Sequence, residues 1–201
     1  QCENPPKHFI NSSTATIYRH SEDKEMDEYT GEIGNDFSMN IAKTWEKTFY
    51  EIDTPNTLKT AIRTSIVLGK NGGAFIPLKK LTQFGLGGKN GNGKQFVSWI
   101  HEKDFARAVE FIIEKELSGS INVVSPKPIR NETFMKKLQK AIGIPFGLAI
   151  SKSLLEIGAK FIKTETELVL KSRNVIPKRL SEEGFEFEYA DIDKTFKNLL
   201  S

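Results

Sequence analysis

The sequence has little of what several classes of protein require. Its 201 residues include one cysteine, Cys2, which excludes an internal disulfide framework and a zinc site built from cysteines. The uncharged stretch Ala141–Ser151 contains glycine and proline and is far shorter than the roughly 20 apolar residues that span a bilayer. No signal peptide opens the chain, so we expect a cytoplasmic location.

The sequence also lacks a large excess of one charge and a pattern of metal ligands. The 29 basic and 26 acidic residues leave a net charge of +3, spread along the chain, so we expect neither a nucleic-acid nor a membrane partner. The three histidines, His8, His20 and His101, share no metal-ligand spacing. We therefore expect no metal site, and a buried structural role for His101.

The chain alternates between strand and helix signals. Short apolar runs predict strands at His8–Ser13, Leu58–Leu68, Phe96–His101 and Ile121–Val124. Asp36 can cap a helix from Phe37 to Glu51, in which Ile41, Trp45 and Phe49 share one face. This alternation predicts βαβ units and a largely parallel sheet.

Two further elements are expected near the C-terminus. Phe185, Phe187 and Tyr189 alternate with glutamates, which predicts a half-exposed strand. Asp191 should begin a final amphipathic helix.

A glycine-rich stretch partly matches a nucleotide-binding P-loop, but the residues after it do not fit that motif. Gly88–Lys94 fits the pattern GxxxxGK, but Gln95 follows where a P-loop carries Ser or Thr. The next segment resembles a strand, whereas a P-loop needs a helix N-terminus there. We expect a surface loop, and as a second possibility a loop that folds over a ligand.

Hydroxyl side chains follow the first strand. Asn11–Tyr18 contains two serines and two threonines before its tyrosine. At the carboxyl edge of an open α/β sheet such groups can bind a ligand. A turn in which serine and threonine bond their own backbone explains the same residues, and the sequence leaves both interpretations open.

Three stretches resemble the extended short-chain dehydrogenases/reductases. Phe9–Tyr18 is similar to the FxSSSATVYG stretch of UDP-galactose epimerases, Arg63–Gly69 to RPGNVYG, and Trp99–Ala106 to YIHVxDLA. The order of further pieces resembles one subfamily of NAD-dependent epimerase/dehydratase-like proteins, also called nucleoside-diphosphate-sugar epimerases, which ends in a small domain of unknown function. Those pieces are Trp45–Glu46, Gly85–Gly88, Gln95–His101, Asn122–Pro126, Val175–Leu180 and Gly184–Phe187.

The resemblance implies an architecture. We expect an α/β Rossmann-like parallel sheet with an interleaved substrate-binding part and a small, mostly helical C-terminal region. Residues 1–142 would be the NAD(P)-binding part and residues 143–201 the small domain. The family's glycine-rich nucleotide loop precedes the first stretch that matches, and the chain begins at Gln1 rather than Met. We therefore expect the N-terminal half of the sheet to be missing.

The resemblance also implies site residues. Thr14 occupies the place of the family's catalytic Ser/Thr, and Tyr18 is a candidate phenol nearby. The family's YxxxK pair is absent, because Phe37 and Ile41 stand at its two places. Val97 stands where the arginine that grips a sugar-nucleotide diphosphate would fall. NAD or NADP is expected at Ser12, Ser13, Thr64 and Ser65, and a small-molecule substrate at Gly87, Gly88, Gln95 and Trp99.

These expectations leave the activity open. The resemblance implies an NAD(P)-dependent oxidoreductase of the epimerase/dehydratase type, acting on a nucleotide sugar or a small carbonyl compound. The missing YxxxK pair favours a catalytically inactive NAD(P)-binding scaffold or sensor instead. A third possibility is a fragment without a function of its own, since an open sheet edge would invite pairing with another chain.

Overall fold

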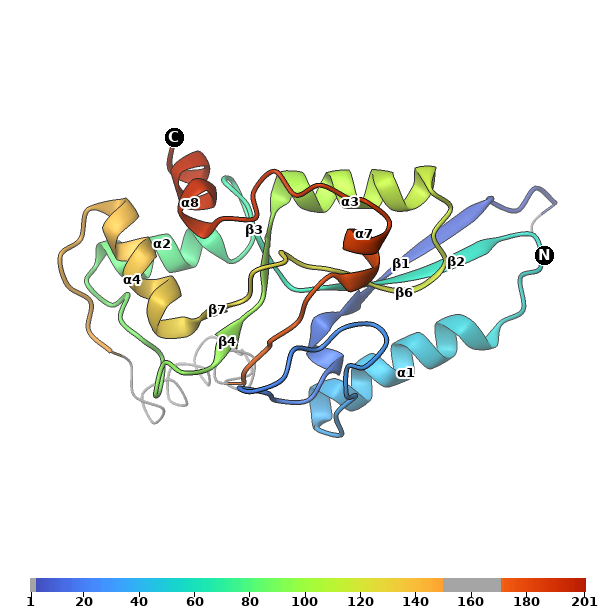
Figure 1. Cartoon of the computed structure of the whole chain (residues 1–201), viewed down its shortest axis with the longest axis horizontal. Helices are drawn as coiled ribbons and strands as arrows, with labels where there is room; N and C mark the ends of the chain where they lie inside the picture. The colour runs from blue at the N-terminus through green and yellow to red at the C-terminus, as the bar shows by residue number, and fades with distance from the viewer. Residues whose placement is uncertain (1–2, 150–170) are drawn as a thin grey trace.

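Three parallel strands form the centre of the structure, a computed structural model that describes residues 3–149 and 171–201. β1 (His8–Thr14) pairs with β2 (Leu58–Thr64), which pairs with β6 (Gly119–Val123). Helix α1 (Phe37–Glu51) covers one face of this sheet and α3 (Glu102–Glu114) the other (Figure 1). The expected α/β fold with a parallel sheet is confirmed.

Two predicted strands are each divided in the structure. β3 (Ile66–Leu68) follows β2 but pairs with β5 (Trp99–His101). β4 (Phe96–Val97) precedes β5 but pairs, antiparallel, with β7 (Ile129–Arg130). The apolar runs continue through Ser65 and Ser98 because the chain stays partly or fully buried there. A run of apolar residues therefore cannot show where a strand changes its pairing partner.

A second lobe is built from three helices (Figure 1). They are α2 (Phe75–Gln83), which the sequence pattern did not reveal, α4 (Asn131–Ile142) and α8 (Ile192–Leu200). Asp191 begins α8 as expected, and its carboxylate accepts hydrogen bonds from the backbone N–H groups of Asp193 and Lys194. The aromatic rings at its core are those of Phe75, Trp99, Phe134 and Phe196.

The C-terminal residues pack onto both lobes. Helix α7 (Lys178–Glu182) and the turn after it place Leu180 and Phe185 in the core beneath α3, whereas α8 packs against α4. The predicted strand around Phe185–Tyr189 is wrong: no ladder pairs it, and the Phe185 ring packs edge-on against Phe111 instead. Ser153 and Glu156 form a capping-box pattern that predicts the start of a helix, but they lie outside the described residues.

Helix α1 has the predicted ends but not the predicted buried face. Its buried residues are Met39, Ala42 and Glu46, while the side chain of Trp45 is 52% exposed. Asp36 makes no side-chain cap, because its carboxylate pairs with Lys171. The spacing of apolar residues could not predict this face, because one of its buried residues is the carboxylate of Glu46.

His101 has the buried structural role that the sequence suggested. Its Nδ1 accepts a hydrogen bond from the Lys103 backbone N–H and so caps α3. Its Nε2 lies 3.0 Å from the Asn198 Oδ1 atom in α8, and its ring stacks on Tyr189. The imidazole therefore joins β5 and α3 to the C-terminal helix.

We expect the protein to lose stability on mild acidification through His101. Burial lowers the pKa of this imidazole despite the raising effect of Asn198. The unfolded chain binds the proton at a pH of about 6.5, so the stabilisation is complete above that pH and is lost as the pH falls through the lowered pKa. Urea unfolding between pH 7.5 and 5 should show this loss.

The variant His101→Asn is the control for this prediction. The pKa of His8 is also lowered by burial, and its contribution cancels when the free energy of unfolding of the variant is subtracted from that of the wild type. The difference should be constant above pH 6.5 and should shrink below it. Parallel curves across the whole range would contradict a role for His101.

Candidate functional site

Hydroxyl groups gather where the parallel strands end. Thr14 and Thr64 are register partners at the last positions of β1 and β2. The Thr14 Oγ1 atom accepts a hydrogen bond from the Thr16 backbone N–H at 3.1 Å, and its hydroxyl hydrogen has no acceptor among the described residues. Within the same ranges, the buried hydroxyls of Ser65 and Ser125 have no partner at all. Unsatisfied buried donors of this kind require an explanation, such as a ligand or water.

The predicted cofactor residues do not all face the same way. Ser12 is exposed and shares a face of β1 with Thr14, because side chains alternate along a strand. Ser13 is buried on the opposite face, where its hydroxyl donates to the Glu46 Oε1 atom at 2.6 Å. Ser13 therefore stabilises the contact between β1 and α1, and Ser12, Thr64 and Ser65 remain as candidates for cofactor binding.

A buried ion pair holds α1 to the sheet. The Arg63 guanidinium donates from Nε to the Glu46 Oε1 atom at 2.8 Å and from Nη2 to Oε2 at 2.7 Å. The two side chains are only 11% and 10% exposed. Burial opposes ionisation of Glu46, but the hydrogen bonds from Arg63 and Ser13 outweigh it and lower its pKa. The pair therefore stays charged.

Tyr18 belongs to this buried network. Its hydroxyl donates to the Asn122 Oδ1 atom at 3.0 Å and accepts from the Arg63 Nη1 atom at 2.8 Å. The side chain has no exposed surface, and burial raises the pKa of the phenol. A substrate cannot reach this hydroxyl in the structure, so we correct the expected role: Tyr18 braces β1 against β2 and β6.

The positions of the family's missing YxxxK pair lie on the outer side of α1. Phe37 is 68% exposed, and Ile41 lies one turn further on. Together with Asn40, Thr44 and Trp45 they line a shallow hollow of about 350 Å³. No residue of this hollow carries a titratable group, so it supplies no proton donor.

The predicted substrate residues form the frame of the second lobe. The Trp99 ring is buried and donates from Nε1 to the Lys127 carbonyl, which corrects its expected position in a pocket lining. Gln95 is also buried, with Nε2 donating to the Asn90 carbonyl. Gly87 and Gly88 lie so close to Thr82 and the backbone of Leu148 that neither glycine has room for a Cβ atom.

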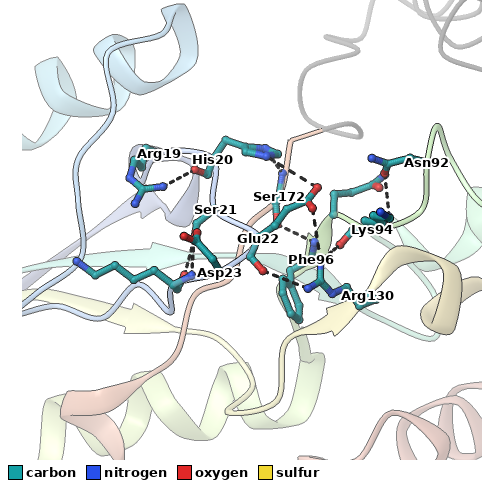
Figure 2. Close-up of polar contacts among 12 residues, drawn as sticks. Arg19, His20, Ser21, Glu22, Asp23, Asn92, Lys94, Phe96, Arg130 and Ser172 are labelled. Atoms are coloured by element: carbon teal, nitrogen blue, oxygen red, sulfur yellow. Dashed lines mark hydrogen bonds and ion pairs between the residues drawn. The ribbon is translucent and has the colours of Figure 1, made fainter.

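Arg130 joins the glycine-rich loop to the loop after β1 (Figure 2). Its guanidinium donates to the carbonyls of Lys94 and Glu22 and lies over the Phe96 ring, 4.1 Å from the ring centroid. Beside it, the Ser172 hydroxyl accepts from the Phe96 backbone N–H at 2.8 Å. These contacts therefore hold the end of the glycine-rich loop and the start of β4 against neighbouring segments.

The pair Glu46–Arg63 was not recognised as a site feature from the sequence. Both residues stand in stretches that carry the family resemblance, but no role followed from it. No single charge marked the pairing, because α1 also contains Lys43, Lys47 and Glu51 and β2 also contains Lys59. Only the burial of Glu46 and Arg63, which the fold decides, distinguishes them from these other charged residues.

Two features, a metal-ligand cluster and a membrane-spanning helix, are absent from the described residues. Within residues 3–149 and 171–201, no three histidine, cysteine or acidic side chains gather as a metal-ligand set. No helix in those ranges has both the length and the apolar composition needed to cross a membrane.

The fold and this edge define the class of protein: an α/β protein with a Rossmann-like parallel sheet. Comparison with known proteins makes it more specific. Over 198 residues the chain is 29% identical to the epimerase family protein YfhF of Bacillus subtilis, covering 98% of this chain and 64% of that one. The human epimerase family protein SDR39U1, solved with NADPH, superposes with a TM-score of 0.90 at 26% identity, covering 99% and 67% of the two chains.

A nucleoside-diphosphate sugar epimerase from Corynebacterium glutamicum superposes with a TM-score of 0.76 at 27% identity, over 96% of this chain and 37% of the other. Residues 152–199 match the model described as Domain of unknown function (DUF1731). The chain is therefore a homologue of the epimerase family proteins. These proteins are similar to the NAD-dependent epimerases and the short-chain dehydrogenases/reductases. It spans less than two thirds of the length of the Bacillus relative.

Proposed function

We propose that the protein is an NADPH-dependent oxidoreductase of the epimerase/dehydratase type, acting on a small carbonyl compound or a nucleotide sugar. The observation that carries this proposal is the row of hydroxyls at the carboxyl edge of β1 and β2, the edge at which open α/β sheets bind ligands. The similarity to a human relative solved with NADPH favours NADP over NAD. Residues 1–142 would hold the cofactor, and residues 143–201 would form the small C-terminal domain.

The residues of this edge suit a nicotinamide and its ribose. The Ser65 hydroxyl is buried without a partner among the described residues, and an amide or hydroxyl of a ligand would satisfy it after a change of rotamer. Ser12 and Thr64 would supply further polar contacts. A nicotinamide held there would donate or accept a hydride.

Thr14 would position the reacting group. Because its Oγ1 already accepts the Thr16 N–H, the hydroxyl hydrogen points elsewhere and can be donated to a substrate carbonyl. Such a donor stabilises the negative charge that develops on the oxygen as hydride arrives. The alkoxide formed by hydride transfer would take its proton from water, so neither Phe37 nor the buried Tyr18 would be required as the donor.

A catalytically inactive NADPH sensor or scaffold is the second candidate. It is favoured by the apolar side chains of Phe37 and Ile41 at the places of the family's tyrosine and lysine. Losing a positioned proton donor lowers a rate by about 10²–10⁴-fold. The two candidates share cofactor binding and differ only in turnover.

We expect NADPH to raise the melting temperature (Tm) of the protein as its gene encodes it. A ligand at 100 times its Kd stabilises the native state by about 2.7 kcal/mol. For a protein of this size that corresponds to roughly 5–10 °C. Thermal unfolding with NADPH and with NADH measures the effect and the preference between the two.

Paired variants make this measurement specific. Thr64→Val with Ser65→Ala should reduce the shift caused by NADPH, whereas Ser118→Ala with Thr133→Val alters hydroxyls on exposed residues elsewhere and should leave it intact. If neither nucleotide moves the Tm of the wild type, both NADPH-binding candidates fail. A shift that survives in Thr64→Val/Ser65→Ala would place the cofactor elsewhere.

A further inference from the structure

Apolar side chains are strongly exposed at one end of the second lobe. Phe84 follows α2 and is 82% exposed, and Phe146 and Leu148 follow α4 and are 66% and 63% exposed. Leu81 and Leu86 add further exposed apolar surface. Soluble proteins rarely leave a contiguous group of large apolar side chains in water unless the group binds something.

Backbone hydrogen bonds gather these residues into one surface. The Leu148 N–H donates to the Gly85 carbonyl at 2.8 Å, and the Gly88 N–H donates to the Leu148 carbonyl at 3.1 Å. The Phe146 ring would lie 3.4 Å from a Cβ atom built on Gly85. We call this surface, made of Leu81, Phe84, Leu86, Phe146 and Leu148, the apolar tip.

The segments that carry the apolar tip contain no acidic residue. Lys70–His101 holds five lysines and Thr133–Ala149 three, and neither segment holds an aspartate or glutamate. The rest of the chain has 21 basic and 26 acidic residues. The expectation that charge is spread evenly is therefore wrong: the excess positive charge lies with α2, the glycine-rich loop and α4, at the end of the molecule away from the N-terminus (Figure 1).

Three of these lysines are next to the apolar tip, and one of them, Lys89, also helps Lys136 to lower the pKa of the Glu132 carboxyl. Lys80 lies one helical turn before Phe84, Lys89 adjoins Gly88, and Lys140 is in the last turn of α4. All three are exposed, and none forms a salt bridge in the part of the chain that the structure describes. Aromatic and leucine side chains surrounded by exposed lysines suit a surface that is apolar inside and anionic outside.

We propose that the apolar tip docks the protein onto an anionic phospholipid membrane. Phe84 and Phe146 enter the acyl boundary while Lys80, Lys89 and Lys140 contact the headgroups. The lysines, and the lack of any acidic residue in Lys70–His101 and Thr133–Ala149, give the apolar tip a charge that complements an anionic headgroup surface. The sequence-based expectation of no membrane partner rested on spanning segments and total charge. Neither quantity can reveal a surface that binds a membrane peripherally.

Sedimentation of the full chain with lipid vesicles tests the proposal. We expect binding to phosphatidylcholine vesicles that contain 30% phosphatidylglycerol, weaker binding to pure phosphatidylcholine, and a decline as salt is raised. Phe84→Ser with Phe146→Ser should weaken binding at least tenfold. The matched control Ile52→Ser with Ile113→Ser alters two exposed apolar residues elsewhere and should bind like the wild type.

Charge variants and two further measurements complete the test. Lys80→Gln/Lys89→Gln/Lys140→Gln should lose the preference for phosphatidylglycerol. Three outcomes would overturn the proposal. They are absence of binding to either vesicle, a wild-type oligomer that the Phe84→Ser/Phe146→Ser variant dissociates in gel filtration, and a lowered Tm of that variant, which would show that the tip packs inside the protein.

Discussion

Replacing Glu46 by glutamine is expected to destabilise the protein by about 3–5 kcal/mol, because it leaves the buried Arg63 guanidinium without a carboxylate. Glutamine keeps the shape of the side chain, so the loss measures the charge rather than the packing. The same carboxylate also accepts the hydroxyls of Ser13 and Ser120. Chemical unfolding at pH 7 gives the free energy directly.

Two further variants decide whether burial is the cause. The double variant Glu46→Leu/Arg63→Met should recover much of the loss, since apolar residues of similar volume often replace a buried ion pair at little cost. Lys47→Gln removes the exposed pair with Glu51 and should cost less than about 1 kcal/mol. An equally small cost for Glu46→Gln would contradict the buried network.

The pH dependence of this pair has a defined sign. The pKa of Glu46 in the folded protein lies below its ordinary value of 4.5, so the pair stabilises the protein fully above that pH. The stabilisation is lost as the pH falls through the lowered pKa. This loss begins below a pH of about 4.5, whereas the loss through His101 begins below a pH of about 6.5.

Thr14→Val should lower turnover by about 10²–10³-fold if the proposed function holds, the range found when one donor to a developing oxyanion is removed. Valine has nearly the shape of threonine but cannot donate to a carbonyl oxygen. The measurement is NADPH oxidation with a panel of ketones and nucleotide sugars. Binding of NADPH itself should change little.

The outcome for Thr14 separates the two candidate functions. Thr14→Ser keeps both the hydroxyl donor and the acceptor of the Thr16 N–H, so it should retain most of the activity. Thr133→Val, on the exposed side of α4, serves as the control. If the wild type oxidises NADPH with no carbonyl tested although NADPH raises its Tm, the scaffold or sensor is the better account.

The candidate site was only partly predictable from residues. The stretch Asn11–Tyr18 indicated hydroxyls at a sheet edge, and the structure brings Thr14 and Thr64 into register there. The strand alternation that turns Ser13 inward, and the partners that bury Tyr18, depend on neighbouring strands. The family resemblance therefore predicted cofactor contacts at hydroxyls on both faces of β1.

The fold was more predictable than its details. Apolar periodicity and the helix start at Asp191 depend on residues close in sequence, and α8 begins where they indicate. Strand pairing depends on distant residues, which is why Leu58–Leu68 divides between two sheets unseen in the pattern.

By itself, the amino-acid order determined the fold class, the helices at residues 37–51 and 192–200, and the family resemblance, because each rests on local periodicity or on contiguous motifs. Only the tertiary structure decided which face of α1 is buried, that Glu46 and Arg63 neutralise each other, and that Phe84 and Phe146 form one exposed surface. Each of these depends on contacts between residues far apart in the chain. Whether a side chain is buried is decided by what the fold packs against it and not by the residue type.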